Sequence, residues 1–571
     1  MQQVKAAVRE DDAAAVAFLA AKPQNRFLQG QDCRGQGISM RTSKTKIPAP
    51  SSKGSLSRAN RGSIHGAMAW MNRRKLIHGI AGIPLLLGGI ALIRMQPYRA
   101  HSVLASAGGC QMSVDVVEPS SGDAQGFVVL LHGISATKRI MWYVAQGFAN
   151  QNLRVFVPDL PGHGRTPGPF TPERAEECTE ALVQELMQRR AIVPEKTILA
   201  GHSMGGALAV RVGARVPVAG VIAISPAPMG TQRLSPEIQL FRDSTPLPAN
   251  SLVLSAAWEP ASVRGYAEDL VRSRSDGTSE YAVITRATHV SLLFDSATLS
   301  HDARWAAHLL HADNNVPFPS HLALYGFLLG TVGLVVLAGP FLVEAAGGQQ
   351  EVEIAEETPA VRPAVALPQV ALVSVLTVIA LRLGVPLRFV HVFQGDYLAS
   401  FFLFGGLALL AWNWKILRVS RKIAVGHILA TAVAAIVLIL LFGAWLDLTF
   451  YEAWLTIPRW LRMPGMFLAF LPWHLAEEIL LGGENSANRW VRTAKALAFR
   501  ALVWLALMGG VFLLHTGEIL MVLLSVYFGL IFVLQRLAVN VVRRETRSVG
   551  AAAVFGAILL AGFCLVIFPV T

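Results

Sequence analysis

The pattern of apolar and polar positions divides the chain into two regions. Between about residues 100 and 315, short apolar runs alternate with stretches in which apolar residues recur at helical spacing. From about residue 320 to the end, long apolar runs follow one another with short loops between them. The first pattern is typical of a globular domain of strands and helices, and the second is typical of helices that cross a membrane.

Seven strands are predicted in the globular region, at 111–117, 126–131, 153–157, 197–200, 220–225, 252–256 and 281–285. Amphipathic stretches at 172–189, 204–216 and 262–272 are predicted to be helices. Strands that are apolar throughout and are joined by helical crossovers indicate a mainly parallel sheet with both faces covered. We therefore expect an α/β fold over residues 98–315, followed by an all-α transmembrane domain over residues 316–571.

Runs long enough to span a membrane lie near 321–343, 364–383, 396–413, 424–446, 464–482, 498–515, 517–535 and 550–569. Residues 71–97 begin with basic residues and continue with an apolar stretch, which predicts an uncleaved signal anchor. This anchor and the eight runs give nine predicted spans. Residues 1–70 have no sustained period and are rich in Ser, Arg, Lys, Gly and Pro, so we expect a disordered extension. Translation from Met68 or Met71 is a further hypothesis.

Three groups of basic residues, at 415–422, 489–500 and 536–547, fall in predicted loops between these runs. With nine spans and the N-terminus inside, all three groups lie on the cytoplasmic side together with Arg73 and Arg74. The same topology places the globular domain outside the cytoplasm. The net charge of +13 is explained in this way, and no basic patch interleaved with aromatic residues suggests a nucleic-acid partner.

The run at 464–482 contains His474, Glu477 and Glu478. Ionisable groups at membrane depth are candidates for function, and internal polar packing or an interfacial location is the plainer alternative. The two glutamates loosely resemble the pair found in intramembrane CAAX-type proteases, but that pattern continues to an Arg where Gly482 stands here.

The four cysteines, Cys33, Cys110, Cys178 and Cys564, form no C-x-x-C motif, so neither a metal site nor a cofactor is expected. Cys110 and Cys178 form a disulfide if the domain lies in an oxidising compartment, and are otherwise free buried thiols. Both alternatives stay open at this point.

A candidate nucleophile lies in the segment Gly201-His-Ser203-Met-Gly205. The predicted strand 197–200 precedes it, and an apolar helical stretch from Gly206 follows it. Glycines at this spacing let a strand turn sharply into a helix and leave the Ser hydroxyl accessible. The flanking pattern therefore predicts that Ser203 is a nucleophile.

A Ser hydroxyl requires a base, and in a fold of this kind an acid and then the base follow it along the chain. His289 follows the last predicted strand, where the base is expected. Glu259 follows the strand 252–256 and is the candidate acid, with Asp269 as the alternative. The backbone N–H groups of Met204 and Ile134 are the candidate oxyanion donors, and His132 is expected to brace the loop that holds Ile134.

These motifs resemble the α/β-hydrolase superfamily, especially its esterase and monoacylglycerol-lipase-like members. The resemblance rests on L-L-H-G at 130–133, P-D-L-P-G-H-G-R-T at 158–166, G-H-S-M-G-G at 201–206 and T-H at 288–289. It covers residues 110–312 and implies hydrolysis of an ester, thioester or amide through an acyl-enzyme. In such relatives Asp159 and His163 shape a loop near the site.

About 25 residues separate Ser225 from Leu252, where many relatives carry a larger helical cap. We therefore expect an open site for a large or amphiphilic substrate, or a site that the membrane region covers. The resulting hypothesis is a membrane-anchored serine esterase or lipase that acts on a lipid or acyl ester. The alternatives are a transporter or channel with a regulatory or inactive hydrolase domain, and an acyltransferase. The sequence does not indicate the oligomeric state.

Overall fold

The computed structural model describes residues 58–96, 100–119, 123–274, 276–312, 319–346, 361–384, 387–419, 425–482 and 489–571. Most of the expected disordered extension, residues 1–57, lies outside the described residues. Helix α2 (Arg58–Met95) begins before the expected anchor at residue 71, so the backbone of residues 58–70 is helical and not disordered. Helix growth from an existing helix costs far less than nucleation, which favours this extension.

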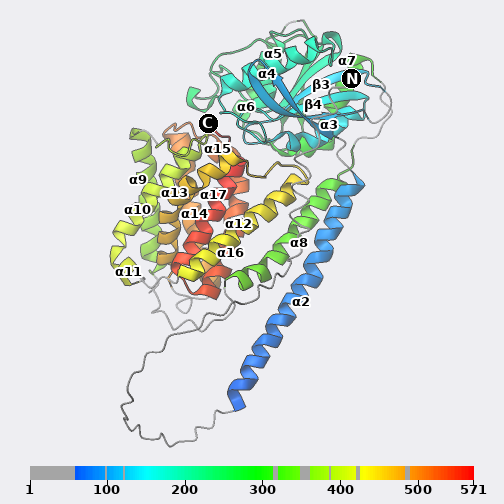
Figure 1. Cartoon of the computed structure of the whole chain (residues 1–571). Coiled ribbons are helices and arrows are strands. Elements are labelled where there is room, and N and C mark those ends of the chain that lie inside the picture. The colour runs from blue at the N-terminus through cyan, green and yellow to red at the C-terminus, as the bar shows by residue number, and fades with distance from the viewer. Residues whose placement is uncertain are drawn as a thin grey trace, which may run out of the picture. The chain divides into compact units, whose positions relative to one another are not determined.

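The globular region, in which β3 and β4 are labelled in Figure 1, contains a sheet. Within the described residues this sheet has eight strands in the order β1-β2-β4-β3-β5-β6-β7-β8. The strands are β1 (Ala100–Ala107), β2 (Cys110–Val117), β3 (Gly126–Leu131), β4 (Leu153–Pro158), β5 (Thr197–His202), β6 (Gly220–Ile224), β7 (Ser251–Ala256) and β8 (Glu280–Ile284). Only the pairs β1–β2 and β2–β4 are antiparallel. The predicted mainly parallel α/β fold is therefore confirmed.

Helices cover both faces of the sheet because successive strand residues point to opposite sides. In β3, Val128 and Leu130 pack in the same apolar cluster as α3 (Trp142–Ala149) and α7 (Ser296–Leu310). Val129 and Leu131 pack in a second cluster with α4 (Pro172–Gln188), α5 (Met204–Gly213) and α6 (Ala261–Arg272). Burial on both faces explains why these strands are apolar throughout.

Strand β1 was not expected, because its sequence A-H-S-V-L-A-S-A mixes polar and apolar residues. It is an edge strand that is mostly exposed, and Gly108 and Gly109, both with positive φ, turn it directly into β2. A disulfide joins Cys110 of β2 to Cys178 of α4, with the two Cα atoms 5.6 Å apart. Of the two alternatives left open for these cysteines, the structure contains the disulfide.

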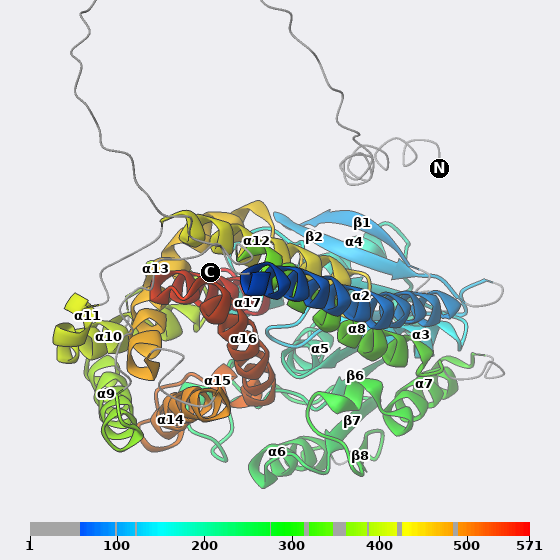
Figure 2. The same ribbon diagram turned by 90° about the horizontal axis from the view of Figure 1, so that it is seen from below.

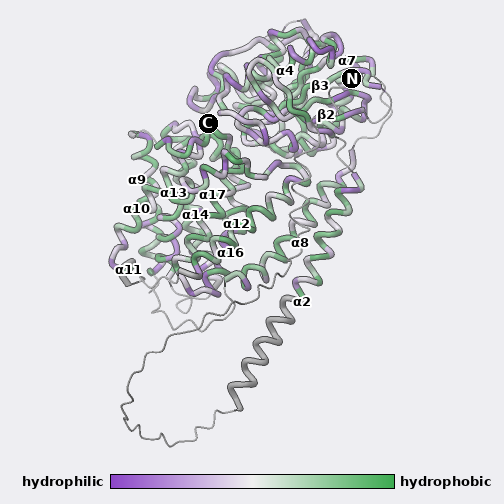
Figure 3. Tube along the Cα trace, in the orientation of Figure 1, coloured by the Kyte–Doolittle hydropathy of each residue, from purple (hydrophilic) through white to green (hydrophobic). Residues whose placement is uncertain are grey.

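After the sheet come the long helices α8 (Leu322–Ala345), α9 (Pro363–Leu383), α10 (Gly395–Trp412), α12 (Val425–Asp447), α13 (Ile457–Leu481), α14 (Arg489–Leu513), α16 (Ser525–Thr546) and α17 (Val549–Ile567). Eight described helices, counting α2, are long and apolar enough to cross a membrane (Figure 3). Helix α13 is a further long helix at the expected position 464–482, but its charged residues separate it from the eight apolar helices.

Helices α2 and α8 lie side by side (Figure 2). They approach so closely that a Cβ added to Gly89 would lie 2.6 Å from the carbonyl oxygen of Gly326. A Cβ added to Gly333 would likewise lie 2.6 Å from the backbone nitrogen of Leu86. Glycines at these positions allow the two backbones to pack in direct contact, as in many membrane helix pairs.

Two of the predicted loops are in fact helical. Helix α14 begins at Arg489, and α16 extends from Ser525 to Thr546 instead of spanning 517–535. Gly517, with φ of 81°, turns the chain, and the short helix α15 (Leu520–Leu523) precedes α16. The basic groups at 489–500 and 536–547 therefore lie largely within helices, and the loop assignment was wrong.

Several of these arginines are ion-pair partners of the two glutamates in α13. Arg500 Nε lies 3.0 Å from Glu477 Oε1, and Arg536 lies 2.6 Å from Glu478 Oε1. Arg492 lies 2.6 Å from the second oxygen of Glu478. These side chains are buried between helices, which fits internal polar packing, the plainer of the two sequence interpretations.

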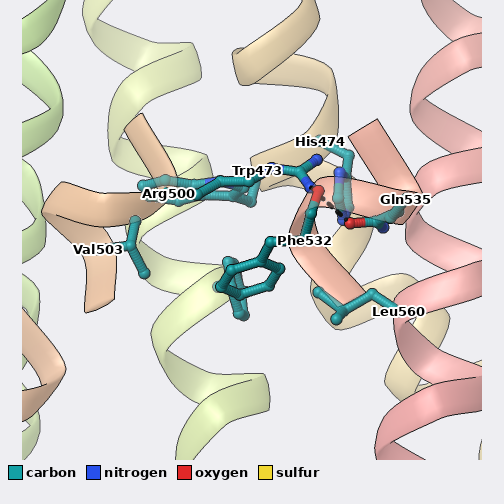
Figure 4. A pocket seen from close by; sticks show the side chains of 8 residues that line it. Trp473, His474, Arg500, Val503, Phe532, Gln535 and Leu560 are labelled. Carbon is teal, nitrogen blue, oxygen red and sulfur yellow. Dashed lines mark hydrogen bonds between the residues drawn. The ribbon is translucent and has the colours of Figure 1, made fainter. Parts of the chain in front are cut away.

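Beside this ion-pair cluster, His474, Arg500 and Gln535 line a small cavity of about 10 Å³ together with aromatic and aliphatic side chains (Figure 4). The guanidinium of Arg500 also donates to the carbonyl of Phe532 at 2.7 Å and to the Gln535 amide oxygen at 2.9 Å. The cavity has room for about one water molecule. Arg500 is thus held by Glu477, by the Gln535 amide and by a backbone carbonyl.

Candidate active site

Ser203 lies at the sharp turn between β5 and α5. Its backbone has φ of 54° and ψ of −117°, a conformation that side-chain-bearing residues seldom adopt. A Cβ added to Gly201 would lie 2.2 Å from the Gly205 carbonyl oxygen, and one added to Gly205 would lie 2.2 Å from that of Leu131. The two glycines are therefore required by the close approach of backbones on either side of the strained serine.

His289 follows β8, and Glu259 follows β7. His289 Nδ1 lies 2.5 Å from Glu259 Oε1, and Glu259 Oε2 accepts a hydrogen bond of 3.0 Å from the Ala256 amide. The carboxylate is 2% exposed and the imidazole 23% exposed. Burial alone would favour the neutral acid, but the hydrogen bond and charge of His289 hold the pKa of Glu259 below its usual value.

The alternative acid, Asp269, is far less suitable. It is exposed on α6 and pairs with Arg233 at 2.6 Å. The structure therefore brings Glu259, and not Asp269, to the imidazole of His289. Glu259 and His289 come together because the carboxyl ends of parallel strands meet at one edge of the sheet.

Ser225, at the end of β6, was not singled out from the sequence. Its hydroxyl donates to Glu259 Oε1 and lies 2.9 Å from His289 Nδ1. It has a positive φ of 46° and is buried. No sequence motif marks this serine, and only its place at the carboxyl end of a neighbouring strand could have suggested it.

His289 and the nucleophile lie on the same side of the domain. His202, the neighbour of Ser203, places its Nε2 atom 2.8 Å from the carbonyl oxygen of His289. The two imidazole rings are 4.8 Å apart. In the described part of the chain no hydrogen bond joins Ser203 Oγ to His289. Burial and the neighbouring His289 lower the pKa of His202 to about 3, so His202 is neutral and serves to hold the loop of His289.

The two candidate oxyanion donors flank the nucleophile. Met204 is the first residue of α5, where backbone N–H groups have no partner within the helix. Ile134 follows Gly133, and a Cβ added to Gly133 would lie 3.2 Å from Ser203 Cβ. His132 receives a hydrogen bond of 3.0 Å from the Leu160 amide, which agrees with its expected bracing role. Burial lowers the pKa of His132 to about 4.

Segments of the helical region lie against loops around the site. The segment between β6 and β7 contains only one short helical turn, η3 (Pro236–Ile238). Its Glu237 lies against Gly517, in the connection that follows α14. The Gly162 carbonyl accepts hydrogen bonds of 3.0 Å from Arg459 of α13 and from the backbone of Val570. The short cap is thus complemented by segments from the helical half.

Residues 128–338 match the model of the alpha/beta hydrolase family. Monoacylglycerol lipase of Mycolicibacterium smegmatis is 35% identical over 123 residues, which cover 21% of this chain and 43% of that protein. The magnesium-chelatase 30 kDa subunit of Rhodobacter capsulatus is 30% identical over 131 residues, covering 23% and 44%. The chain thus spans less than half the length of these curated relatives.

Among solved structures, an esterase/lipase from an uncultured bacterium is similar, with 16% identity and a TM-score of 0.30. The alignment covers 39% of this chain and 88% of that one.

Proposed function

The globular region of this chain is an α/β-hydrolase domain, and from that premise we propose that the protein is a membrane-embedded serine hydrolase that cleaves lipid or acyl esters. The observation that carries the proposal is the contact of 2.5 Å between His289 Nδ1 and the buried Glu259, next to the strained Ser203. A buried acid that holds an imidazole beside a serine at such a turn is the arrangement that activates a hydroxyl nucleophile.

In the proposed reaction, Ser203 Oγ attacks the ester carbonyl while His289 Nε2 takes its proton. We expect the hydrogen bond between these two atoms to form when substrate is bound, as is common in sites of this kind. The negative charge that forms on the carbonyl oxygen is stabilised by the N–H groups of Ile134 and Met204. His289 then gives its proton to the departing alcohol, and a water molecule releases the acyl group by the same steps in reverse.

The substrate class follows from the cover of the site. A short cap leaves the site dependent on segments of the helical bundle, and Ile134 contacts the apolar clusters of both the hydrolase and the bundle. An apolar side chain shared by both clusters beside the nucleophile favours an amphiphilic ester taken from the bilayer. The name of the monoacylglycerol lipase relative supports an ester substrate.

The side of the membrane is also part of the proposal. Asp447, at the end of α12, pairs with Arg165 of the hydrolase at 2.9 Å. Because the long helices alternate in direction, the helix ends that carry Lys415, Arg492 and Arg543 lie on the far side, where basic residues favour the cytoplasm. The Cys110–Cys178 disulfide supports an oxidising, extracytoplasmic location for the hydrolase domain.

A fluorophosphonate probe applied to intact cells tests the proposal. We expect labelling of the wild type, and loss of labelling and of ester hydrolysis by about 10⁴-fold or more in Ser203→Ala. Ser300→Ala, a change of the same size on α7, is the matched control and is expected to retain both. Labelling that persists in Ser203→Ala would overturn the assignment of the nucleophile.

Lipid profiles of cells that carry Ser203→Ala separate the remaining functions. Accumulation of an ester lipid supports hydrolysis. A product that changes with an added alcohol or sugar instead indicates acyl transfer. Unchanged lipids together with solute flux that is independent of Ser203 would favour the transporter hypothesis.

A further inference from the structure

The loop that carries the oxyanion donor Ile134, residues 133–138, is held by a segment of the membrane region. This segment is the connection between α12 and α13, residues 448–456, named here the α12–α13 connection. The Tyr451 hydroxyl donates to the Ser135 carbonyl at 2.9 Å, and the Glu452 amide donates to Thr137 Oγ1 at 3.1 Å. Two successive residues of the connection thus bind the loop on either side of Ala136.

Ser135 requires such support. Its φ of 57° is a strained conformation for a residue with a side chain. Its amide donates a hydrogen bond of 3.3 Å to His163 Nε2 of the hydrolase domain. Among the described residues, its carbonyl accepts a hydrogen bond only from Tyr451, which belongs to the bundle. The peptide groups before and after Ser135 are therefore oriented by the two different halves of the protein.

A buried charge cluster fixes the end of the same loop. The ammonium of Lys138 is fully buried and lies 3.3 Å from Asp115, 3.4 Å from Asp159 and 3.4 Å from Glu452. Asp159 also accepts a hydrogen bond of 2.8 Å from the Lys138 amide. Two of the three carboxyl groups belong to the hydrolase and one to the α12–α13 connection. Such a cluster is sensitive to position, because buried charges are tolerated only in close pairs.

We propose that Tyr451 and Glu452 are positioning residues for the oxyanion donor Ile134, so that the membrane bundle sets the rate of the hydrolase and not merely its location. The inference rests on the proposed serine hydrolase function. A donor must lie within about 0.5 Å of its place to stabilise the charge that forms on the carbonyl oxygen. The α12–α13 connection meets this requirement from outside the hydrolase domain.

The test compares two Tyr→Phe variants of the full chain in lipid nanodiscs, with a short p-nitrophenyl ester as the probe. Tyr451→Phe removes only the hydroxyl that binds the Ser135 carbonyl. Tyr143→Phe removes a matched contact between the two halves, in which Tyr143 Oη accepts a hydrogen bond of 3.1 Å from the Leu324 amide. We expect kcat to fall about tenfold in Tyr451→Phe, with KM within about twofold, while Tyr143→Phe keeps the wild-type kcat.

A second pair of variants guards against a general loss of structure. Thr137→Val removes the acceptor of the Glu452 amide at constant shape and is expected to lower kcat, while Thr137→Ser, which keeps the hydroxyl, restores most of it. Melting temperatures of all variants are measured beside the rates, and we expect them to change little.

Failure of this inference is distinct from failure of the proposed function. A wild-type rate that Ser203→Ala does not lower would overturn the proposed function itself. A wild-type rate that depends on Ser203 but is the same in Tyr451→Phe would overturn only the positioning role. Equal loss of kcat in Tyr451→Phe and Tyr143→Phe would also overturn it, because the contact with the oxyanion loop would then have no special effect.

Discussion

Buried carboxylates occur both in the hydrolase domain and in the bundle, and the two groups differ in the side chains that pair with them. Glu259 faces His289, whose imidazole is partly open to solvent. Glu477 and Glu478 face guanidinium groups that are themselves buried, and the imidazole of His474, 3.5 Å from Glu477, is closed off from solvent as well. An imidazole takes up and releases protons near neutral pH, whereas a guanidinium stays charged. The first arrangement suits proton transfer, and the second joins helices.

The comparison teaches that a buried acid is not by itself a sign of chemistry. Both groups would have been ranked as candidate sites on burial and charge alone. The partner across the hydrogen bond decides whether the acid orients a mobile proton or only offsets a fixed charge. The predictions below test this difference, in order of decreasing effect.

The largest effect is expected for Glu259→Gln in the hydrolase domain. The amide keeps the shape but cannot stabilise the imidazolium or select the correct tautomer, so kcat is expected to fall by about 10⁴-fold. Ester hydrolysis by purified protein measures it, and Asp269→Asn on the exposed face of α6 is the control. A kcat within tenfold of the wild type would show that another group serves as the acid.

In the bundle, Arg500→Leu is expected to affect stability. It removes the nearer of the two guanidinium groups beside the buried Glu477 and leaves only Arg536 at 3.9 Å, which lowers the free energy of unfolding by about 3–5 kcal/mol. Denaturation in detergent measures the loss, and Arg544→Leu, which breaks an exposed pair with Glu545, is the control.

Adding Glu477→Leu to Arg500→Leu removes the buried charge that has lost its nearest partner and is expected to recover most of the lost stability. A double variant that is less stable than Arg500→Leu alone would contradict the view that this cluster only holds helices together.

A smaller effect is expected for Ser225→Ala. The change removes the hydroxyl that donates to Glu259 and touches His289, so the orientation of the acid is less well held. We expect kcat to fall about tenfold, since one charge-assisted hydrogen bond is lost while the acid and base remain. Ser251→Ala, at the opposite end of β7, provides the comparison. A wild-type kcat in Ser225→Ala would remove this serine from the site.

The smallest effect concerns Glu452, the carboxyl group that joins the two regions. Burial and the nearby Asp159 raise its pKa to about 8, against an ordinary value of 4.5, while Lys138 and Arg165 oppose this rise. A raised pKa means that the folded state favours the protonated acid. The resulting stabilisation is complete below about pH 4.5 and is lost as the pH rises through about 8.

The melting temperature of the full chain is therefore expected to fall between pH 7 and pH 9 through this group. The comparison variant is Glu452→Gln, which has no proton to lose at this position. Asp447 and His132, which also face Glu452, are the same in both proteins. We expect a smaller fall in this variant, and an identical fall in both proteins would contradict the assignment of the titration to Glu452.

The proposed catalytic residues could be selected from the sequence because their signals are local. Gly201 and Gly205 mark a turn that few sequences need, and His289 and Glu259 each follow an apolar strand. Once the strands are parallel, their carboxyl ends must share one edge, so residues almost ninety positions apart meet without further information. The choice of Glu259 over Asp269 required the structure, because both lie near the expected position in the sequence.

Contacts between the two regions had no such signal. Tyr451 is a single tyrosine in a short connection, and its partner is a backbone carbonyl, which leaves no trace in side-chain patterns. The arginines of α14 and α16 were assigned to loops because charge beside an apolar run usually marks the end of a span. Their burial depends on glutamates in α13, a pairing that only the packing of three helices creates.

The order of apolar and polar residues predicted an α/β domain joined to a set of apolar helices, and motifs that resemble those of α/β-hydrolases indicated a candidate serine, acid and base within it. Periodicity and turn chemistry act over short stretches of chain, so the amino acids alone carry that information. Tertiary structure decided which buried charges pair, that Ser225 contacts Glu259, and how the bundle contacts the loop that carries Ile134. These outcomes depend on surfaces that come together only when distant segments pack.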